Sequence, residues 1–263
     1  KINDLLTTAV TRKAILIITQ CAEIIGRKPE SFIFNAATAL SGILTGLKKD
    51  GIYMVRDGVA LGSWAHLMTY IHYPEPEVFG RVQKLVLDTC RTEHGVHVGA
   101  AGKSMTATCP WMEGLFAWSS ALNKSRDAMK YLKMMTRFTN YYGGLCEVLY
   151  VYGESSRDWF VAAHGVFIAA LADMIVRRDG DKITIFPCGT EGFPEKISFS
   201  NFRLPGEILA SVKYGDDLSV KLENLSWTGQ EIIVEAGGHR ETLVIEGKSS
   251  RSVIFSENLY LQE

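Results

Sequence analysis

The stretch from Arg177 to Pro187 reads RRDGDKITIFP, and it separates two kinds of sequence pattern. Before it, apolar residues recur at intervals of three and four, which is typical of amphipathic helices. After it, apolar and polar residues alternate in short runs, which is typical of strands that bury one face. The sequence therefore predicts a mainly α fold over residues 1–180, followed by a small antiparallel β domain over residues 181–263.

The expected helices follow one another in pairs. Gly26 separates the first pair because glycine readily takes the left-handed conformation that ends a helix. Later helices end at glycine- or proline-containing turns. Paired helices joined by polar and aromatic loops indicate part of an (α/α) toroid, a fold in which helix-end loops surround a central cleft. The expected helices span residues 5–25, 29–47, 63–71, 76–92, 106–122, 125–138 and 159–176.

The expected strands begin directly after the change of pattern. Lys182–Pro187 alternates, and turns such as Tyr214–Asp217 and Ala236–Gly238 separate the later runs. Such turns contain the glycine and aspartate that tight turns favour. The further runs are residues 207–212, 218–222, 231–234, 241–245 and 251–255.

Composition excludes several classes of function. The chain has a formal charge of −1 and scattered basic residues, so it lacks the basic patch of a nucleic-acid or acidic-membrane partner. Inspection finds no apolar run long enough for a membrane span. The five cysteines show no zinc-site spacing, and His94 and His97 lack a third ligand nearby. We therefore expect no metal and no other cofactor.

Four segments, in order along the chain, resemble the α-L-fucosidase family of inverting glycoside hydrolases (family 95). Ile52–Gly58 is similar to that family's IGRDG strand, and Trp64–Pro74 to its HLSHLYGLYP stretch. Cys109–Trp118 resembles GWSLAWKINLW, and Asp173–Pro187 resembles MLLQSHDGEIHLLP, where an inner helix passes into a β domain. No single segment is specific, because toroid glycosidases share much of this pattern. The four segments in this order are more specific together.

The resemblance implies a toroid catalytic domain flanked by β domains, and hydrolysis of a terminal sugar by two carboxyl groups. It implies a secreted or periplasmic location, which the residues themselves leave open. The chain departs from the family at two places. The family's DGNFG motif falls on Val161–Gly165, which has no aspartate, and its paired histidines are reduced to His66. The family's acid would precede Lys1.

We therefore expect the C-terminal part of a larger protein. Because the expected helices are too few to close a ring, an apolar flank should remain exposed. The partner on that flank would be the missing N-terminal segment or a second copy of the chain.

Inverting hydrolysis needs one carboxylic acid and one carboxylate that activates water. The loop between Cys146 and Trp159 carries carboxylates beside aromatic rings, which are suited to the apolar faces of a sugar. The start of the helix after Pro110 would face the same cleft in a toroid. The candidate catalytic residues are Glu113, Glu154 and Asp158, and the candidate substrate-binding residues are Trp64, His66, Trp111, Tyr152 and His164.

Each candidate also has a structural interpretation. Glu113 suits the first turn of a helix, where the dipole favours an acid. His66 in an apolar stretch is often an interior histidine, and the loop could simply be solvated. Three functions are therefore compared: a glycoside hydrolase, a non-catalytic carbohydrate-binding protein and a helical scaffold. Carboxylates and aromatics at the expected cleft favour the first two, and Val161 in place of an aspartate keeps the second open.

Overall fold

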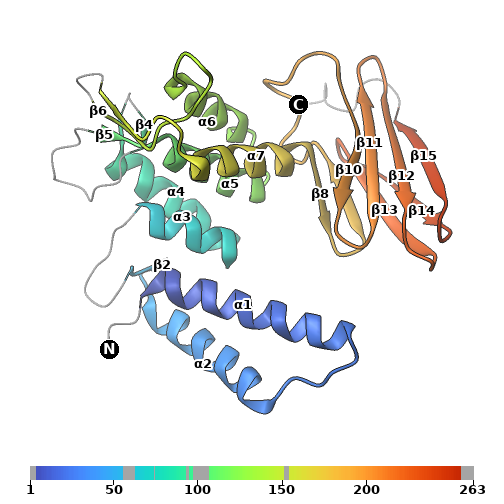
Figure 1. Cartoon of the computed structure of the whole chain (residues 1–263), viewed down its shortest axis with the longest axis horizontal. Helices are drawn as coiled ribbons and strands as arrows, with labels where there is room; N and C mark the ends of the chain where they lie inside the picture. The colour runs from blue at the N-terminus through green and yellow to red at the C-terminus, as the bar shows by residue number, and fades with distance from the viewer. Residues whose placement is uncertain are drawn as a thin grey trace. The chain divides into compact units, whose positions relative to one another are not determined.

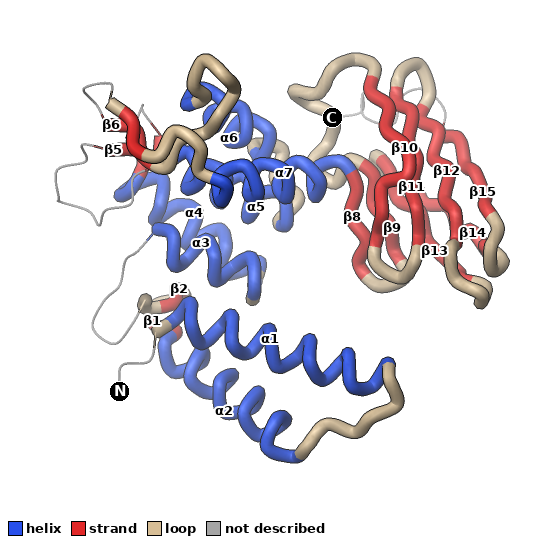
Figure 2. Tube along the Cα trace, viewed as in Figure 1, coloured by secondary structure: helices blue, strands red, loops and turns tan. Residues whose placement is uncertain are grey.

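The computed structural model describes residues 4–55, 63–73, 75–92, 95–96, 107–150 and 154–255. They divide into two compact units, one mainly helical and one built of strands (Figures 1 and 2). The helical unit comprises residues 1–123 and 131–167, and the β unit comprises residues 124–130 and 168–263.

The secondary structure follows the order expected from the sequence, helices first and strands afterwards. In the described part of the chain the α-helices are α1 (Leu5–Ile24), α2 (Ser31–Leu47), α3 (Ser63–His72), α4 (Pro76–Cys90), α5 (Pro110–Leu122), α6 (Ala128–Met135) and α7 (Val161–Ile175). A 3-10 turn, Thr136–Phe138, extends α6. Short strands lie between the helices: β1 (Lys48–Lys49), β2 (Ile52–Tyr53), β3 (Arg91–Thr92), β4 (Gly95–Val96), β5 (Ala107–Thr108), β6 (Val148–Tyr150) and β7 (Ser155–Ser156).

Helix α5 lies in the core of the helical unit. Met112, Leu115 and Phe116 are fully or almost fully buried. At Gly114 a Cβ atom would come 2.7 Å from Val166 of α7 and 2.8 Å from Met135 of α6, so only glycine permits this approach. The close packing fixes the first half of α7 against α5, and that position matters for the candidate site.

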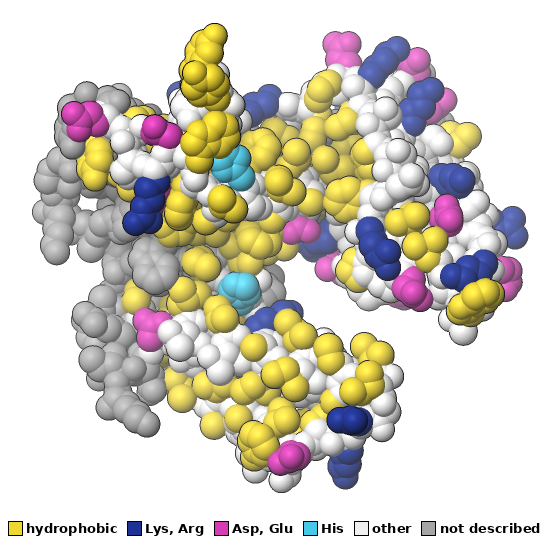
Figure 3. All heavy atoms as spheres, in the orientation of Figure 1, with side chains coloured by type: hydrophobic (Ala, Val, Ile, Leu, Met, Phe, Trp, Pro, Cys, Tyr) yellow, Lys and Arg dark blue, Asp and Glu magenta, His cyan; other side chains and the backbone are white. Residues whose placement is uncertain are grey.

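The first two helices bury much less of their apolar surface than their sequence pattern predicts. They pack against each other, and the Arg12 guanidinium donates to Ser41 Oγ at 2.8 Å. Yet of α1 only Leu5, Thr8 and Ala9 are buried. Hydrophobic side chains are spread among polar ones over the visible face of this hairpin (Figure 3). The exposed large hydrophobic residues of the two helices and their connection are Val10, Ile17, Ile18, Ile24, Ile25, Phe32 and Phe34. The helical spacing of residues 29–47 predicts that Phe32 points inward, and its 63% exposure shows that this prediction is wrong.

Helix α1 is also unusually long and apolar. Its 20 residues have a mean hydropathy of 1.2, so by length and composition alone it is long and apolar enough to cross a membrane. Core helices of soluble proteins and signal sequences pass the same test. The sequence expectation overlooked this helix because Arg12, Lys13 and Glu23 interrupt its apolar residues.

The β unit is a sandwich of two four-stranded sheets. One sheet has the order β10-β11-β12-β15 and the other β14-β13-β9-β8. Residues from both sheets form a single core, which includes Ile183, Val220 and Val234. The strands are β8 (Val176–Asp179), β9 (Lys182–Ile185), β10 (Ile197–Leu204), β11 (Ile208–Tyr214), β12 (Leu218–Asn224), β13 (Gln230–Ala236), β14 (His239–Ile245) and β15 (Ser250–Phe255).

Two of these strands are absent from the sequence expectation. In β10 the register with β11 shifts between Phe199 and Phe202, and this irregularity breaks the alternation that identifies a strand. Strand β8 follows α7 without a loop, so its first residue, Val176, falls in the expected helix, and the other three show no alternation. The sheets are not wholly antiparallel either, because β13 pairs with β9 in parallel.

Candidate functional site

A small three-stranded sheet brings together the segments that lead into α5 and α7. Thr108 of β5 pairs with Leu149 of β6, which pairs in turn with Ser155 of β7. Helix α5 begins two residues after β5, and α7 begins shortly after β7. The rings of Trp111 and Phe160 meet edge to face with their centroids 6.3 Å apart. The N-terminal ends of α5 and α7 therefore lie side by side.

A turn next to the start of α7 displays two tyrosines. The side-chain oxygen of Asn140 accepts hydrogen bonds from the backbone N–H groups of Tyr142 and Gly144, at 3.0 and 2.8 Å. This arrangement closes the turn in the way asparagine commonly does. It leaves Tyr141 95% exposed and Tyr142 77% exposed, with their rings edge to face at 5.2 Å. Figure 3 shows hydrophobic side chains gathered on the loop that follows α6.

This turn packs directly on the segment before α7. Asn140 Nδ2 donates to the Asp158 carbonyl oxygen at 3.2 Å. At Gly144 a Cβ atom would come 2.9 Å from the Trp159 ring, so the backbone must approach there without a side chain. Trp159 is 60% exposed and lies parallel to the His164 ring, with the centroids 6.1 Å apart. We call the exposed rings of Tyr141, Tyr142 and Trp159, which lie on these two packed segments, the aromatic cluster.

His164 lies next to this cluster, with its ring parallel to that of Trp159. Its Nε2 accepts a hydrogen bond from the Leu145 backbone N–H at 3.2 Å, and its Nδ1 lies 3.0 Å from the Phe160 carbonyl oxygen. A nitrogen that accepts carries no hydrogen, so in this pattern the ring hydrogen lies on Nδ1, which donates to Phe160. Both nitrogens thus bond the protein's own backbone. His164 positions Trp159 and the 145–160 loop, and its ring face, not its nitrogens, contacts the cluster.

Of the three loop carboxylates, Glu154 and Asp158 are exposed and Glu147 is partly buried. Asp158 accepts a hydrogen bond from Ser155 Oγ at 2.5 Å, which holds the carboxylate beside Trp159. Glu154 is exposed one residue before β7. Glu147 forms an ion pair with Arg157 at 3.0 Å. Asp158 and Glu154 therefore remain accessible to a ligand, whereas Glu147 already has a cationic partner.

Glu113 has a different setting. Its carboxylate is fully buried, accepting from the Arg91 guanidinium at 2.8 Å and from the Val96 backbone N–H at 3.0 Å. These bonds tie the first turn of α5 to the β3–β4 hairpin. Burial raises the pKa of this carboxyl group, although Arg91 acts in the opposite direction. A raised pKa suits a catalytic acid, but a fully enclosed carboxyl group cannot reach a substrate without movement of that hairpin.

His66 belongs to another group of side chains. It is buried, with Nε2 2.6 Å from the Tyr53 carbonyl oxygen, and it borders a cavity of only about 10 Å³. The Tyr53 hydroxyl in turn donates to Glu75. Trp64 occupies the first turn of α3, but its side chain lies outside the described part of the chain, as does all of Tyr152.

The structure thus joins some of the candidates and separates others. Trp111, Asp158 and His164 gather around the start of α7 through Phe160 and Trp159. The sequence interpretation missed Tyr141 and Tyr142, although two adjacent tyrosines followed by Gly143-Gly144 are a signal for an exposed aromatic turn.

Comparison with known proteins shows that the chain resembles solved glycosidase structures in fold. No protein-family model matches the chain, and no curated protein matches it either. Among solved structures, a wild-type glycosidase is similar over 65% of this chain and 51% of its own, with a TM-score of 0.54 and 13% identity. A point variant described as a glycosidase gives the same score and identity, with 52% of its chain covered. The chain therefore has a glycosidase-like fold and spans about half the length of these glycosidases.

Proposed function

We propose that this chain is the C-terminal part of a glycoside hydrolase and that its sugar binds against the aromatic cluster. The observation that carries the proposal is the exposure of Tyr141, Tyr142 and Trp159 beside the accessible carboxylate of Asp158. Aromatic faces pack well against the C–H faces of a sugar ring, and a group of exposed rings is typical of an interaction site. The glycosidase-like fold supports the same conclusion.

In this proposal Asp158 activates water and Glu154 is the accessible acid. Inverting enzymes place the two carboxyl groups roughly 6.5–9.5 Å apart, which leaves room for that water. Glu113 takes a positioning role, because its carboxylate already binds Arg91 and Val96. The resemblance to inverting α-L-fucosidases makes a terminal L-fucose the first sugar to test. Trp111 supports the aromatic cluster through Phe160.

The alternative is a carbohydrate-binding protein without catalysis. A specific observation favours it: the carboxyl group of Glu113, whose raised pKa would suit an acid, is enclosed. In addition, Val161 stands where the family resemblance places an aspartate. In this alternative the aromatic cluster binds sugar and Asp158 contributes only a hydrogen bond.

The toroid itself is also part of the proposal. A closed ring would cover the exposed apolar side chains at the free end of the α1–α2 hairpin, including Ile24 and Phe32. Because the chain spans about half of the similar glycosidases, we propose that further toroid helices occupy this surface.

Binding is tested first, with two matched tryptophans. Trp159→Ala should weaken L-fucose binding about threefold to tenfold, since an aromatic contact contributes about 0.5–1.5 kcal/mol. Trp227→Ala is the control, because Trp227 is also exposed but lies in the β unit, next to Lys248. Calorimetric titration of both variants measures the effect. Equal affinities would remove the aromatic cluster from the binding site.

Catalysis is tested separately with aryl glycosides. Asp158→Asn and Glu154→Gln should each lower kcat by roughly 10²–10⁴-fold if they act as base and acid. Asp216→Asn, an exposed carboxylate of the β unit, should leave kcat unchanged. Sugar binding with no hydrolysis by the wild-type chain, joined to its missing helices, would favour the non-catalytic alternative.

A further inference from the structure

The β unit contains a cavity that the proposed sugar site does not use. Its volume is about 540 Å³, within the range of sites for small molecules. Its walls come from the segment after α5, the turn after β9 and the turn between β13 and β14. The polar side chains on these walls include Lys124, Arg126, Thr184, Glu191 and Glu235.

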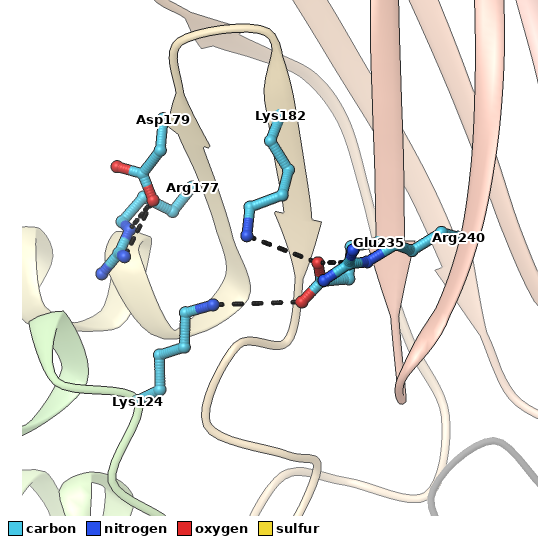
Figure 4. A network of polar contacts seen from close by, with 6 residues as sticks. All are labelled: Lys124, Arg177, Asp179, Lys182, Glu235 and Arg240. Carbon is cyan, nitrogen blue, oxygen red and sulfur yellow. Dashed lines mark hydrogen bonds and ion pairs between the residues drawn. The ribbon is translucent and has the colours of Figure 1, made fainter.

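One carboxylate on the cavity wall, Glu235, attracts three cations. Glu235 lies 3.1 Å from Arg240, 3.4 Å from Lys182 and 3.9 Å from Lys124 (Figure 4). Burial works to raise the pKa of Glu235, but the cations outweigh it and the pKa is lowered. Because Arg240 and Lys182 are closer, they neutralise Glu235 before Lys124 does. The Lys124 ammonium group, on the cavity wall, therefore shares Glu235 with two closer cations and lies 3.9 Å from it.

Counting Lys124 itself, the charged side chains in and around the cavity carry one net positive charge. Burial and then the nearby Lys182 lower the pKa of Lys124, and Arg177 adds to the effect. Arg177 itself pairs with Asp179 at 2.8 Å. In and around the cavity, five basic side chains face four acidic ones: Lys124, Arg126, Arg177, Lys182 and Arg240 against Asp173, Asp179, Glu191 and Glu235.

A hydroxyl group on the cavity wall lacks a partner. Thr184 is 5% exposed, and its Oγ1 has no hydrogen-bond partner among the residues that the structure describes. On the sheet it lies between Arg177 of β8 and Glu235 of β13. A buried hydroxyl without a partner is costly, and an acceptor atom from a ligand would satisfy it.

The backbone around the cavity is strained in the same region. Lys124 has φ of 56° and Phe186 has φ of 47°, both in the left-handed region that residues with side chains seldom adopt. Both residues line the cavity. Such conformations gather at ligand sites, where the surrounding structure holds them in place. Here they direct the Lys124 side chain and the turn after β9 toward one space.

We propose that this cavity binds a small ligand of sugar size that carries an oxyanion, namely a carboxylate, sulfate or phosphate group. Lys124 supplies the positive charge, and the Thr184 hydroxyl donates a hydrogen bond to an anion oxygen. Lys182 and Arg240 keep Glu235 neutralised so that it does not repel the ligand. The inference is independent of the proposed hydrolase function, because every residue in it belongs to the β unit.

Titration of the full chain with sodium sulfate, inorganic phosphate and D-glucuronate, at matched ionic strength, tests this proposal. D-Glucose and sodium chloride serve as the neutral and simple-ion references. We expect saturable binding of at least one oxyanion and a rise in Tm with its concentration. Preference for glucuronate would identify an acidic sugar as the source of the anion. Preference for sulfate or phosphate would identify a sulfate or phosphate ester, or the free ion, as its source.

Two variants separate binding from folding. Lys124→Met should weaken oxyanion binding about tenfold or more, as expected for a lost charged hydrogen bond. Thr184→Val should weaken it severalfold while Tm without ligand stays the same or rises, because the hydroxyl has no partner to lose. Lys221→Met and Thr242→Val, both exposed on the β unit, are the controls. Absence of saturable binding, or wild-type affinity in both cavity variants, would overturn the proposal.

Discussion

Two isoleucines show how differently the two units use their apolar residues. Ile183 in β9 is completely buried in the core of the sandwich, whereas Ile24 at the end of α1 is 83% exposed. Both stand in clear periodic patterns in the sequence. The sandwich supplies both faces of its own core, but the α1–α2 hairpin supplies only one. A periodic pattern therefore shows which face is apolar, and only the other elements present decide whether that face becomes buried.

The largest expected effect comes from replacing these two isoleucines by alanine. Ile183→Ala should lower the free energy of unfolding of the β unit by about 2–5 kcal/mol, because it removes buried methylene groups and leaves a cavity. Ile24→Ala should change it by less than about 0.5 kcal/mol, as is usual at the surface. Urea unfolding followed by circular dichroism compares them. Similar costs at both positions would mean that the end of α1 is buried in solution.

Two carboxyl groups, Glu113 fully buried and Glu235 partly buried, extend the comparison to pH. In the helical unit the pKa of Glu113 is raised, mainly by burial, so the folded state binds its proton more readily than the unfolded state. Stability should therefore fall as pH rises from about 4.5 through the raised pKa. In the β unit the pKa of Glu235 is lowered, so its stabilising contribution is present above about 4.5 and is lost as pH falls through the lowered pKa.

Amide substitutions should reveal these opposite signs. The wild type should lose stability toward high pH because of Glu113, and Glu113→Gln should abolish that loss. It should also lose stability toward low pH because of Glu235, and Glu235→Gln should abolish that one. Each loss amounts to about 1.4 kcal/mol of unfolding free energy for every unit of pKa shift. Melting temperatures of both variants and the wild type across the pH range measure the slopes. Glu23→Gln, on the exposed side of α1, is the matched control. Parallel slopes for the two variants would show that burial and cations do not act as described.

The smallest effect concerns association. The exposed side chains of Ile24 and Phe32 lie at the free end of the α1–α2 hairpin, where they can join two chains or a partner. Replacing both by serine should shift the sedimentation profile of the isolated chain toward the monomer. Val244→Ser, an exposed apolar residue of β14, should not do so. A wild-type chain that sediments as a well-behaved monomer would argue against a missing partner.

The sequence predicts those parts of the structure that depend on residues close together along the chain. The alternating strands of the sandwich and the order of the helices depend on local periodicity, and they were predictable. The strands β5, β6 and β7 have at most three residues each, too few for a period, so their pairing could not be foreseen. Yet this pairing brings Trp111 close to Phe160 and shapes the aromatic cluster.

The candidate site shows the same limit. The acidic and aromatic residues of the 146–159 loop stand out in the sequence, but the sequence does not show that Glu113 is enclosed by Arg91 and Val96. Those partners are separated from Glu113 along the chain, so their contact depends on the tertiary fold. Likewise, Nε2 of His164 finds its partner, the Leu145 N–H, only once the turn at Leu145 has closed over α7, whereas Nδ1 has a local partner in Phe160.

The parallel pairing of β9 with β13 also affects how the chain is made. Residues 186–229, which include β10, β11 and β12, lie between these two strands. At synthesis rates of about 5–20 residues per second, this segment takes on the order of seconds to emerge. During that interval the β8–β9 hairpin exposes an unpaired edge with Ile183 and Ile185, a template for pairing with other chains. Nascent chains that stop before Gln230 are therefore the form most exposed to aggregation and most in need of a chaperone.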